Sequence, residues 1–548
     1  MKTSIKQKYI SNAFLLIVSS VIVKVISALY KIPLTSYIGA TGRGYFSLAY
    51  NLCLPIHALT MGAFPIAMSK LVSKYNALGD NKKISALKKS GQKLFFFAAL
   101  SGLLAMLVFA KPYSELISSS PKSIYTVFAL APSVFFCCLG AGRRSFAEGF
   151  IDMKPTSICQ IIEALFKMVF GLLFAKLSMS YLVENYYELG TVLGVAYENE
   201  KSALSAIYPV TSACSMLGVT LGGFAGYVYV DIYVKNKYRY PKPDKDLSRE
   251  TFYELFSFSV PILFATAIQS VAAFFDTSSL QYALTLCDSS KLANLYNYSG
   301  KDIYTYVFGI YSSTLDFKNL IPGMVMALGV TAVPAVSSSF ESDSPRFNLL
   351  LNSIMKYTSI LACFGGIVLS LFSNEILTLF YGNNNDDIAK YGSQILFYLG
   401  VGILPCCLAS SCVFISQSLS LSKKTVMPFA VSGIVRVVMN ILLVPRFELN
   451  ISLSALSNFV GFSLIFIWNM IIISNNTNVS FDINNIFIKP ILCTSISYFA
   501  VKFIKEAFFT QISFLLSFLI CAAICFVLTF FLLILFKCIK PGDVLTSK

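Results

Sequence analysis

Positively charged residues recur within apolar stretches of this sequence, and they are the first candidates for chemistry. Lys24 and Lys31 lie seven residues apart in one stretch, and Lys167 and Arg436 each interrupt another. In a helix, Lys24 and Lys31 share a face, about 10 Å apart along the axis. Lysine binds phosphate, and arginine binds it through two parallel hydrogen bonds. These side chains therefore predict a site for an anion such as phosphate or pyrophosphate.

Each of these cations also has a structural interpretation, which stays open at this point. An ionisable group in a spanning helix costs at least ~2.5–3.5 kcal/mol on insertion scales, so it needs a compensating partner or an aqueous cavity. Lys24 could form an ion pair, and Lys31 could extend to the membrane surface. Glu163 lies four residues before Lys167 and could neutralise it locally.

Further polar residues in apolar stretches are candidates for substrate binding, ion coupling or gating. We assign Lys318 and Gln269 to the substrate site, with lower weight than the cations above. His57 is the single histidine of the chain and could carry a proton, although a hydrogen-bonded packing role is the more common one. Acidic candidates for coupling or gating are Glu163, Asp276 and Asp316.

Prolines interrupt the same apolar stretches. We expect helix breaks at Pro33, Pro65, Pro261 and Pro334. Within a bilayer, the backbone groups freed at a break must be satisfied by protein or by water in a cavity. Broken helices around a central site are typical of transporters, whereas kinking for packing is the alternative.

The elements that position these residues follow from composition. The chain has 548 residues, of which 56%, about 307, are hydrophobic and 13% are charged, whereas a soluble chain has roughly 45–50% and about 25%. This excludes a soluble and a disordered protein. At about 20 residues per crossing, we predict an all-α polytopic membrane protein of about 14 helices, at residues 9–35, 45–72, 91–111, 122–142, 155–179, 203–234, 252–276, 303–336, 349–372, 390–415, 426–446, 452–474, 484–505 and 512–537.

Loop charges orient these helices in a bacterial cytoplasmic membrane. The net charge is +16. Basic residues gather in the even-to-odd loops, with seven lysines between Lys70 and Lys93 and six basic residues between Asp231 and Glu250. By the positive-inside rule, both termini are predicted to be cytoplasmic. Because this charge is explained by the membrane, and no aromatic-basic module occurs in a loop, we expect no nucleic-acid partner.

The chain repeats itself at one offset. Gly62–Ala67 resembles Val330–Ala335, and Ala164–Val169 resembles Gly433–Val438. The separation is 269 residues both from Pro65 to Pro334 and from Lys167 to Arg436. The repeat predicts two pseudo-symmetric six-helix lobes, residues 1–240 and 241–475, followed by helices 13 and 14 in residues 476–548. Lys167 and Arg436 then occupy equivalent positions. Chance similarity between apolar segments is the alternative.

Several kinds of chemistry are not expected. The 14 cysteines lie mostly in apolar stretches without a CxxC pair, which is typical of small buried side chains. With one histidine, a His-based metal site is not expected. A GxxxxGK[ST] run does not occur, so a built-in P-loop ATPase is not expected either. We therefore predict a non-enzymatic transporter with no metal or cofactor, driven by a gradient or by the membrane potential.

A family resemblance rests on particular runs of residues. The N-terminal runs are Tyr30–Leu34, Ile38–Ala40 and Gly62–Val72, and the most specific is Glu148–Ser157, continued by Gln160–Leu165. They resemble the stage V sporulation protein B and lipid II flippase-like branch of the multidrug/oligosaccharidyl-lipid/polysaccharide (MOP) exporter superfamily. Gly218–Gly226 and Val431–Pro445 also look similar to it.

The resemblance implies a flippase for an undecaprenyl-pyrophosphate-linked saccharide, plausibly lipid II. A cationic central cavity would bind the pyrophosphate during alternating access of the two lobes, and helices 13 and 14 would form a groove for the lipid tail. Lys24 and Lys31 match the family's basic pair in helix 1, where relatives often have arginine. Membrane lipids and the cell-wall synthesis machinery are the implied partners.

Two alternatives remain from the sequence. A cation-coupled multidrug exporter of the same superfamily would need an acidic residue deep in helix 1, and this helix contains lysines instead. A non-transporting scaffold for envelope or spore assembly would tolerate neutralisation of the charges in the spanning helices. The saccharide, the coupling ion and the choice between vegetative wall, spore cortex and capsule stay open.

Overall fold

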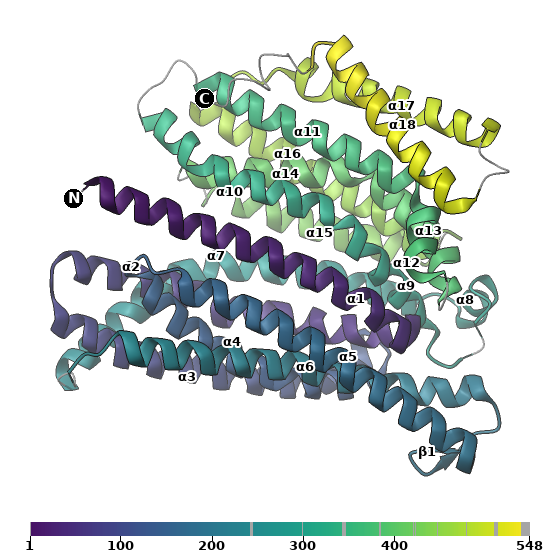
Figure 1. Ribbon diagram of the computed structural model, residues 1–548, viewed down its shortest axis with the longest axis horizontal. Helices are drawn as coiled ribbons and strands as arrows, with labels where there is room; N and C mark the ends of the chain where they lie inside the picture. Colours follow the sequence, from purple (N-terminus) through teal and green to yellow (C-terminus); the bar gives the residue numbers. More distant parts are fainter. Residues whose placement is uncertain are drawn as a thin grey trace. The chain divides into compact units, whose positions relative to one another are not determined.

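A computed structural model of the chain describes residues 2–241, 245–298, 300–341, 347–382, 385–419, 421, 423–446, 448–477, 479–508 and 513–538. Nearly all of the described chain is helical (Figure 1). An all-helical structure is the expected result for an apolar chain, because a helix satisfies its own backbone hydrogen bonds in lipid. The contacts divide the chain into two compact units, Met1–Gly309 and Ile310–Lys548.

The first unit contains the elements of the N-terminal half. They are α1 (Lys2–Met61), α2 (Ala63–Ala77), α3 (Asn81–Pro112), a π-turn (Tyr113–Ile117), a 3₁₀ turn (Pro121–Ser123), α4 (Ile124–Glu148), α5 (Lys154–Leu189), β1 (Thr191–Val192), β2 (Val195–Ala196), α6 (Glu200–Lys237), α7 (Lys245–Thr285), α8 (Ser289–Leu295) and the start of α9 (Ile303–Lys318).

The second unit contains the remainder of α9 and the helices that follow it. They are α10 (Leu320–Glu341), α11 (Phe347–Leu371), α12 (Ser373–Tyr381), α13 (Asp386–Val401), α14 (Ile403–Ser418), α15 (Val426–Leu443), a 3₁₀ turn (Asn450–Leu453), α16 (Ser454–Thr477), a π-turn (Asn484–Ile488), α17 (Lys489–Phe508) and α18 (Phe514–Leu535). The predicted helices 13 and 14 correspond to α17 and α18, which pack against each other and against α11.

The membrane-spanning helices confirm the predicted fold class. Within the described ranges, 11 helices are long and apolar enough to cross a membrane, or up to 12 if the bent pair α13–α14 is one span. The 60 residues Val18–Ala77, most of α1 together with α2, enter this count once, although a straight helix of this length would extend about 90 Å against a hydrocarbon core of about 30 Å. The predicted helices 8 and 10 are each two helices here: α9 and α10 meet at Asn319, and α13 and α14 meet at Gly402 with a bend of 48°.

Gly39 divides α1 into two helices, which correspond to the first two predicted spans. Its φ of 64° and ψ of −177° leave the helical region, and residues with a Cβ rarely adopt a positive φ. A Cβ at this position would also lie 3.2 Å from the ring of Tyr208. The reversal of the chain at residues 36–44 therefore depends on glycine at this position.

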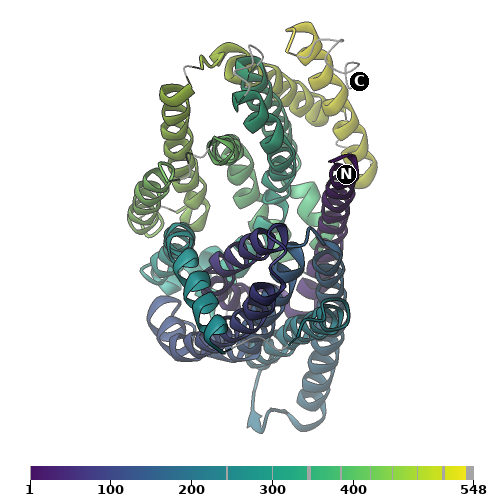
Figure 2. The same ribbon diagram turned by 90° about the vertical axis from the view of Figure 1, so that its left-hand side faces the viewer.

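Helices α5 and α6 extend beyond the other helices of the first unit and carry β1 and β2 at their far end (Figures 1 and 2). At about 54 and 57 Å, they are longer than a membrane crossing requires. Leu193 and Gly194, both with positive φ, form the two-residue turn between the antiparallel strands. Leu182, Val192 and Ile207 give this end a small core of its own.

Candidate functional site

Lys167 lies in a cage of aromatic rings between α5 and α1. Its Nζ is 5.1 Å from the ring centre of Tyr30, 5.0 Å from that of Tyr50 and 6.0 Å from that of Phe46. It donates a hydrogen bond to the Tyr50 hydroxyl at 3.0 Å. Ring faces attract a cation, most strongly where water is excluded. The cage therefore explains how a charged residue is held within a spanning helix.

The two lysines of α1 differ in their surroundings. Lys24 is exposed, whereas Lys31 is half-buried and precedes Pro33 by two residues. Its neighbour Tyr30 is 1% exposed and contributes a ring to the cage of Lys167. The helix continues through Pro33 and is interrupted at Gly39 instead. The break predicted at Pro33 is thus displaced by six residues.

Arg43 is a cation that the sequence analysis did not select. It lies four residues after Gly39, is 3% exposed, and its Cζ is 5.2 Å from the ring centre of Phe46. Phe46 therefore faces both Arg43 and Lys167. The sequence did carry a signal for Arg43: it is an arginine shortly after Gly39, in a region that has no acidic residue. The first Asp or Glu of the chain is Asp80.

Glu163 pairs with Arg144, which lies on the neighbouring helix α4. Oε1 of Glu163 is 3.3 Å from Nη1 of Arg144 and also accepts a hydrogen bond from the Cys159 thiol. Arg143, the preceding residue, pairs with Asp231 of α6 at 2.8 Å. The predicted span at residues 122–142 ends just before both arginines. They lie inside α4 instead, and each stabilises the packing of α4 against another helix.

The remaining coupling candidates are separate from this pair. His57 is half-buried in α1, and its Nε2 has no hydrogen-bond partner among the described residues. Asp276 in α7 and Asp316 in α9 are both half-buried. Their roles stay predictions.

Lys318 and Arg436 come together in the second unit, although they are far apart in the sequence. The Nζ of Lys318 is 5.8 Å from the ring centre of Phe462, and the Cζ of Arg436 is 5.0 Å from the same ring. Arg436 is 6% exposed. Lys167 and Arg436, which the repeat relates, are thus both held against aromatic rings, each within its own unit.

The remaining predicted positions are three prolines and Gln269. Pro65 is the third residue of α2, in the first turn after Gly62, where proline does not interrupt a hydrogen bond. The break in this region therefore lies before Pro65 and not at it. The side chains of Gln269, Pro261 and Pro334 lie outside the described part of the structure.

A large apolar pocket lies within the second unit, between α11, α13, α14, α16 and α17. It has a volume of about 650 Å³. Its lining includes Gly366, Val401, Phe459, Phe499 and Thr494. A second apolar pocket of about 360 Å³ shares Val401 and Phe459 with the first. Apolar clefts of this size are typical of sites for hydrophobic ligands.

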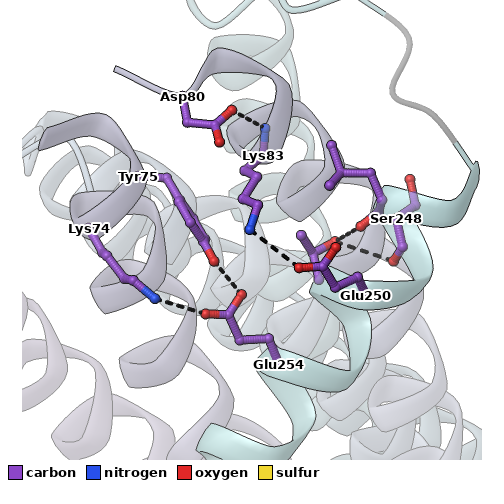
Figure 3. A network of polar contacts seen from close by, with 9 residues as sticks. Lys74, Tyr75, Asp80, Lys83, Ser248, Glu250 and Glu254 are labelled. Atoms are coloured by element: carbon purple, nitrogen blue, oxygen red, sulfur yellow. Dashed lines mark hydrogen bonds and ion pairs between the residues drawn. The ribbon is translucent and has the colours of Figure 1, made fainter. Parts of the chain in front are cut away.

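A network of polar contacts ties the α2–α3 connection to the beginning of α7 (Figure 3). Glu254 pairs with Lys74 at 3.1 Å and accepts a hydrogen bond from the Tyr75 hydroxyl. Glu250 pairs with Lys83 at 3.3 Å. Asp80 accepts a hydrogen bond from the backbone N–H of Lys83 at 2.9 Å and so caps α3. This end of the first unit is therefore held by charges on three helices.

The fold and these cations define a polytopic membrane protein of the transporter type. A family model described as "Polysaccharide biosynthesis protein" matches residues 9–197. The lipid II flippase MurJ of Bacillus subtilis (strain 168) is 22% identical over 495 residues, covering 87% of this chain and 84% of that protein. The stage V sporulation protein B of the same organism is 20% identical, covering 87% and 86%.

Solved structures agree with the sequence matches. The inward closed conformation of the lipid II flippase MurJ superimposes with a TM-score of 0.66, at 14% identity, over 96% of this chain and 99% of that one. An inward-facing multidrug resistance transporter of the MOP superfamily superimposes with a TM-score of 0.65, at 12% identity, over 83% and 96%. The resemblance inferred from the sequence is confirmed: the chain is similar to both relatives over most of its length and has the fold of these MOP-superfamily structures.

Proposed function

We propose that this protein moves a polyprenyl-pyrophosphate-linked saccharide, such as lipid II or a related polysaccharide precursor, across the cytoplasmic membrane by alternating access. The observation that carries this proposal is the charge of the first two spans. These spans and the turn between them contain Lys24, Lys31 and Arg43 but no carboxylate, because the first acidic residue is Asp80. Such a segment suits an anionic substrate and lacks the usual ligands of a coupling cation.

The cation–aromatic clusters support recognition of a pyrophosphate. The ammonium of Lys167 is held among three aromatic rings and bonded to the Tyr50 hydroxyl, which keeps a positive charge within a spanning helix. Lys318 and Arg436 offer a second pair of cations at Phe462. Lysine in place of arginine in α1 keeps the charge but lacks the planar fork that binds phosphate with two hydrogen bonds.

The apolar pockets of the second unit support binding of the lipid tail. α17, the first of the two C-terminal helices, contributes Ile491, Thr494 and Phe499 to the larger pocket. A polyprenyl chain has no polar group after its pyrophosphate, so an almost wholly apolar lining suits it. We therefore place the tail along α17 and next to α16, and the transported headgroup at the cations.

A flipping assay in a strain depleted of its own lipid II flippase tests the proposal. We expect Lys31→Ala and Lys24→Ala each to lower translocation at least tenfold, and Lys31→Arg to keep most of it, because the charge is the essential property. Lys201→Gln is the matched control, since Lys201 is an exposed lysine at the start of α6. Activity of both alanine variants at the level of this control would overturn the cationic mechanism.

The same assay separates the two alternatives. A non-transporting scaffold would support growth equally well with the neutralised variants, provided that they are inserted in normal amounts. A cation-coupled multidrug exporter would instead depend on a sodium or proton gradient and would not relieve the precursor accumulation. We expect collapse of the membrane potential to slow translocation, because the substrate is anionic.

A further inference from the structure

A small cleft lies between α3, α4 and α6 in the first unit, on residues that the proposed transport mechanism does not use. Its polar lining is Lys88, Gln92 and Arg143, and its aromatic lining is Phe95, Phe146 and Tyr227. The space accessible to the centres of water-sized atoms is about 40 Å³. A cleft of this size has room for only a few water-sized atoms, such as the oxygens that a phosphate group presents to the lining.

The charges around this cleft favour an anion. Arg143 pairs with Asp231 at 2.8 Å, and Lys235 pairs with the same carboxylate at 2.6 Å. The Nζ of Lys88 donates to the backbone carbonyl of Tyr238 at 2.8 Å. Two of these cations therefore pair with one carboxylate and Lys88 is bonded to a backbone carbonyl, so a net positive charge remains. An ammonium has three donors and a guanidinium five, so donors are left for a ligand after these bonds.

Gln92 completes the polar lining. With its amide oriented so that the oxygen faces Arg143, it accepts a hydrogen bond from Nη2 at 3.2 Å. Its two N–H donors then remain available to an anion. Gln92 is exposed, whereas Arg143 is mostly buried, so the glutamine lies at the mouth of the cleft.

A row of phenylalanine rings crosses the outer surface of the same three helices. Phe96 of α3 contacts Phe135 of α4, with ring centres 5.9 Å apart. Phe135 contacts Phe136 at 5.6 Å, and Phe136 contacts Phe224 of α6 at 5.1 Å. Phe96 is 46% exposed and Phe224 is 44% exposed. We call Phe96, Phe135, Phe136 and Phe224 the ring row.

The ring row lies on the membrane side of the cleft on all three helices. In α3, Phe96 comes four residues after Gln92, further from the charged end at Lys82 and Lys83. In α4 and α6, which run the opposite way, Phe135 comes eight residues before Arg143, and Phe224 three residues before Tyr227. At 1.5 Å per residue, the rings lie roughly 5–12 Å from the cleft. A cationic headgroup pocket thus adjoins an exposed apolar surface.

We propose that the cleft and the ring row bind an anionic glycerophospholipid of the surrounding bilayer. The phosphodiester lies at the mouth of the cleft with its oxygens directed towards Lys88, Gln92 and Arg143, and the acyl chains lie against the rings. Basic pockets between spanning helices are known sites for anionic lipid headgroups. Because the cleft lies among α3, α4 and α6, this lipid binds apart from the transported substrate and does not depend on the proposed flippase activity.

Native mass spectrometry of the purified full chain tests this site. The probes are phosphatidylglycerol, phosphatidylcholine, inorganic phosphate and undecaprenyl phosphate. We expect the wild type to retain phosphatidylglycerol, and Lys88→Gln and Gln92→Glu to retain it at least fivefold less. Retention of phosphatidylcholine should change less than twofold. Lys82→Gln removes an exposed lysine at the start of α3 and serves as the matched control.

The other results decide against the proposal. Equal retention in Lys88→Gln, Gln92→Glu and Lys82→Gln would overturn it. Displacement of phosphatidylglycerol by inorganic phosphate at equal concentration would show an ion site and not a lipid site. If undecaprenyl phosphate displaced phosphatidylglycerol from the wild type but not from Gln92→Glu, the cleft would be a site for the transported substrate. Should Lys88→Gln fail to fold, the exposed Gln92→Glu decides alone, with thermal melting as its folding check.

Discussion

Arg144 of α4 and Glu163 of α5 form an ion pair at 3.3 Å inside the first unit, with side chains only 15% and 26% exposed. The Cys159 thiol donates to the same carboxylate oxygen at 3.1 Å. Removal of one partner from a buried pair leaves an uncompensated charge. The free energy lost in this way is larger than the net stabilisation that the intact pair provides. The pair therefore makes the α4–α5 packing sensitive to single substitutions.

We expect Glu163→Gln to destabilise the protein by about 3–5 kcal/mol, because the Arg144 guanidinium stays buried without its counterion. The double variant Arg144→Met, Glu163→Met should recover most of this loss. Thermal melting in detergent measures both. Lys111→Ala is the control, since its pair with Glu115 is exposed on both sides at 4.0 Å. A loss in Glu163→Gln no larger than in this control would contradict the prediction.

Asp152 predicts a specific dependence of stability on pH. It lies in the α4–α5 loop and accepts hydrogen bonds from Lys237 at 2.6 Å, Tyr238 at 2.9 Å and Tyr233 at 3.0 Å. Burial alone would raise the pKa of Asp152, but these hydrogen bonds outweigh burial and hold its pKa below the usual value. Since the folded pKa is depressed, the stabilisation is complete above the unfolded pKa of about 3.9 and is lost as the pH falls through the folded pKa.

The stability difference between wild type and Asp152→Asn should accordingly be constant from about pH 5 to pH 8 and shrink below about pH 4. Melting curves across this range measure it. Asp246→Asn, at an exposed position near the start of α7, is the matched variant and should show no such decline. A difference that persisted unchanged at pH 3 would disprove the role of the Asp152 carboxylate.

Gly39→Ala should destabilise the protein by about 1–2 kcal/mol, because an alanine at a φ of 64° is strained. Its methyl group would also lie 3.2 Å from the Tyr208 ring. Gly140→Ala is the comparison, since its Cβ would lie 3.7 Å from the nearest atom inside regular helix. There we expect no loss, or a gain of roughly 0.5–1 kcal/mol. Equal melting temperatures for the two variants would refute the requirement for glycine at residue 39.

Phe462 couples two candidate substrate-binding residues, so their substitutions should not be additive. Phe462→Leu is expected to remove about 0.5–2 kcal/mol of cation–aromatic attraction from Lys318 and Arg436. Translocation by Lys318→Gln and Arg436→Gln, singly and together, should then depart from additivity only when Phe462 is present. The flipping assay measures this, with the exposed Phe503→Leu as control. If the effects were strictly additive both with Phe462 and in Phe462→Leu, Lys318 and Arg436 would act independently of each other.

Filling the larger apolar pocket should block transport without unfolding the protein. Ser463 of α16 lines this pocket, and Ser463→Phe would occupy space that we assign to the polyprenyl tail. We expect at least a tenfold loss of translocation with a change in melting temperature of under 3 °C. Ile471→Phe places the same ring at an exposed position of α16 and should be active. Full activity of Ser463→Phe would show that the polyprenyl tail does not bind in this pocket.

The positions of the spans along the chain could be predicted from the sequence because hydrophobic runs are a local property. α17 and α18 lie where the last two runs were placed, and Gly39 lies between the first two. Helix interruptions were less predictable. Proline marked the regions of Pro33 and Pro65, but the chain departs from helical φ/ψ at Gly39, and α2 begins after Gly62. Pro65 lies in the first turn of α2, where proline is compatible with a helix.

The partners of the charged residues could not be predicted in this way. Spacing identifies neighbours within one helix, whereas Glu163 pairs across to Arg144, and Lys318 meets Arg436 through Phe462. Arg43 was missed because only charges inside predicted spans were considered. The large apolar pocket is lined by five helices, from α11 to α17, so no single segment carries a signal for it.

The hydrogen bonds of Asp152 also restrict how the first unit can move. One carboxylate joins the loop after α4 to the end of α6, and α5 lies between these two helices in the chain. Any transport cycle must therefore displace α4, α5 and α6 together as a single body.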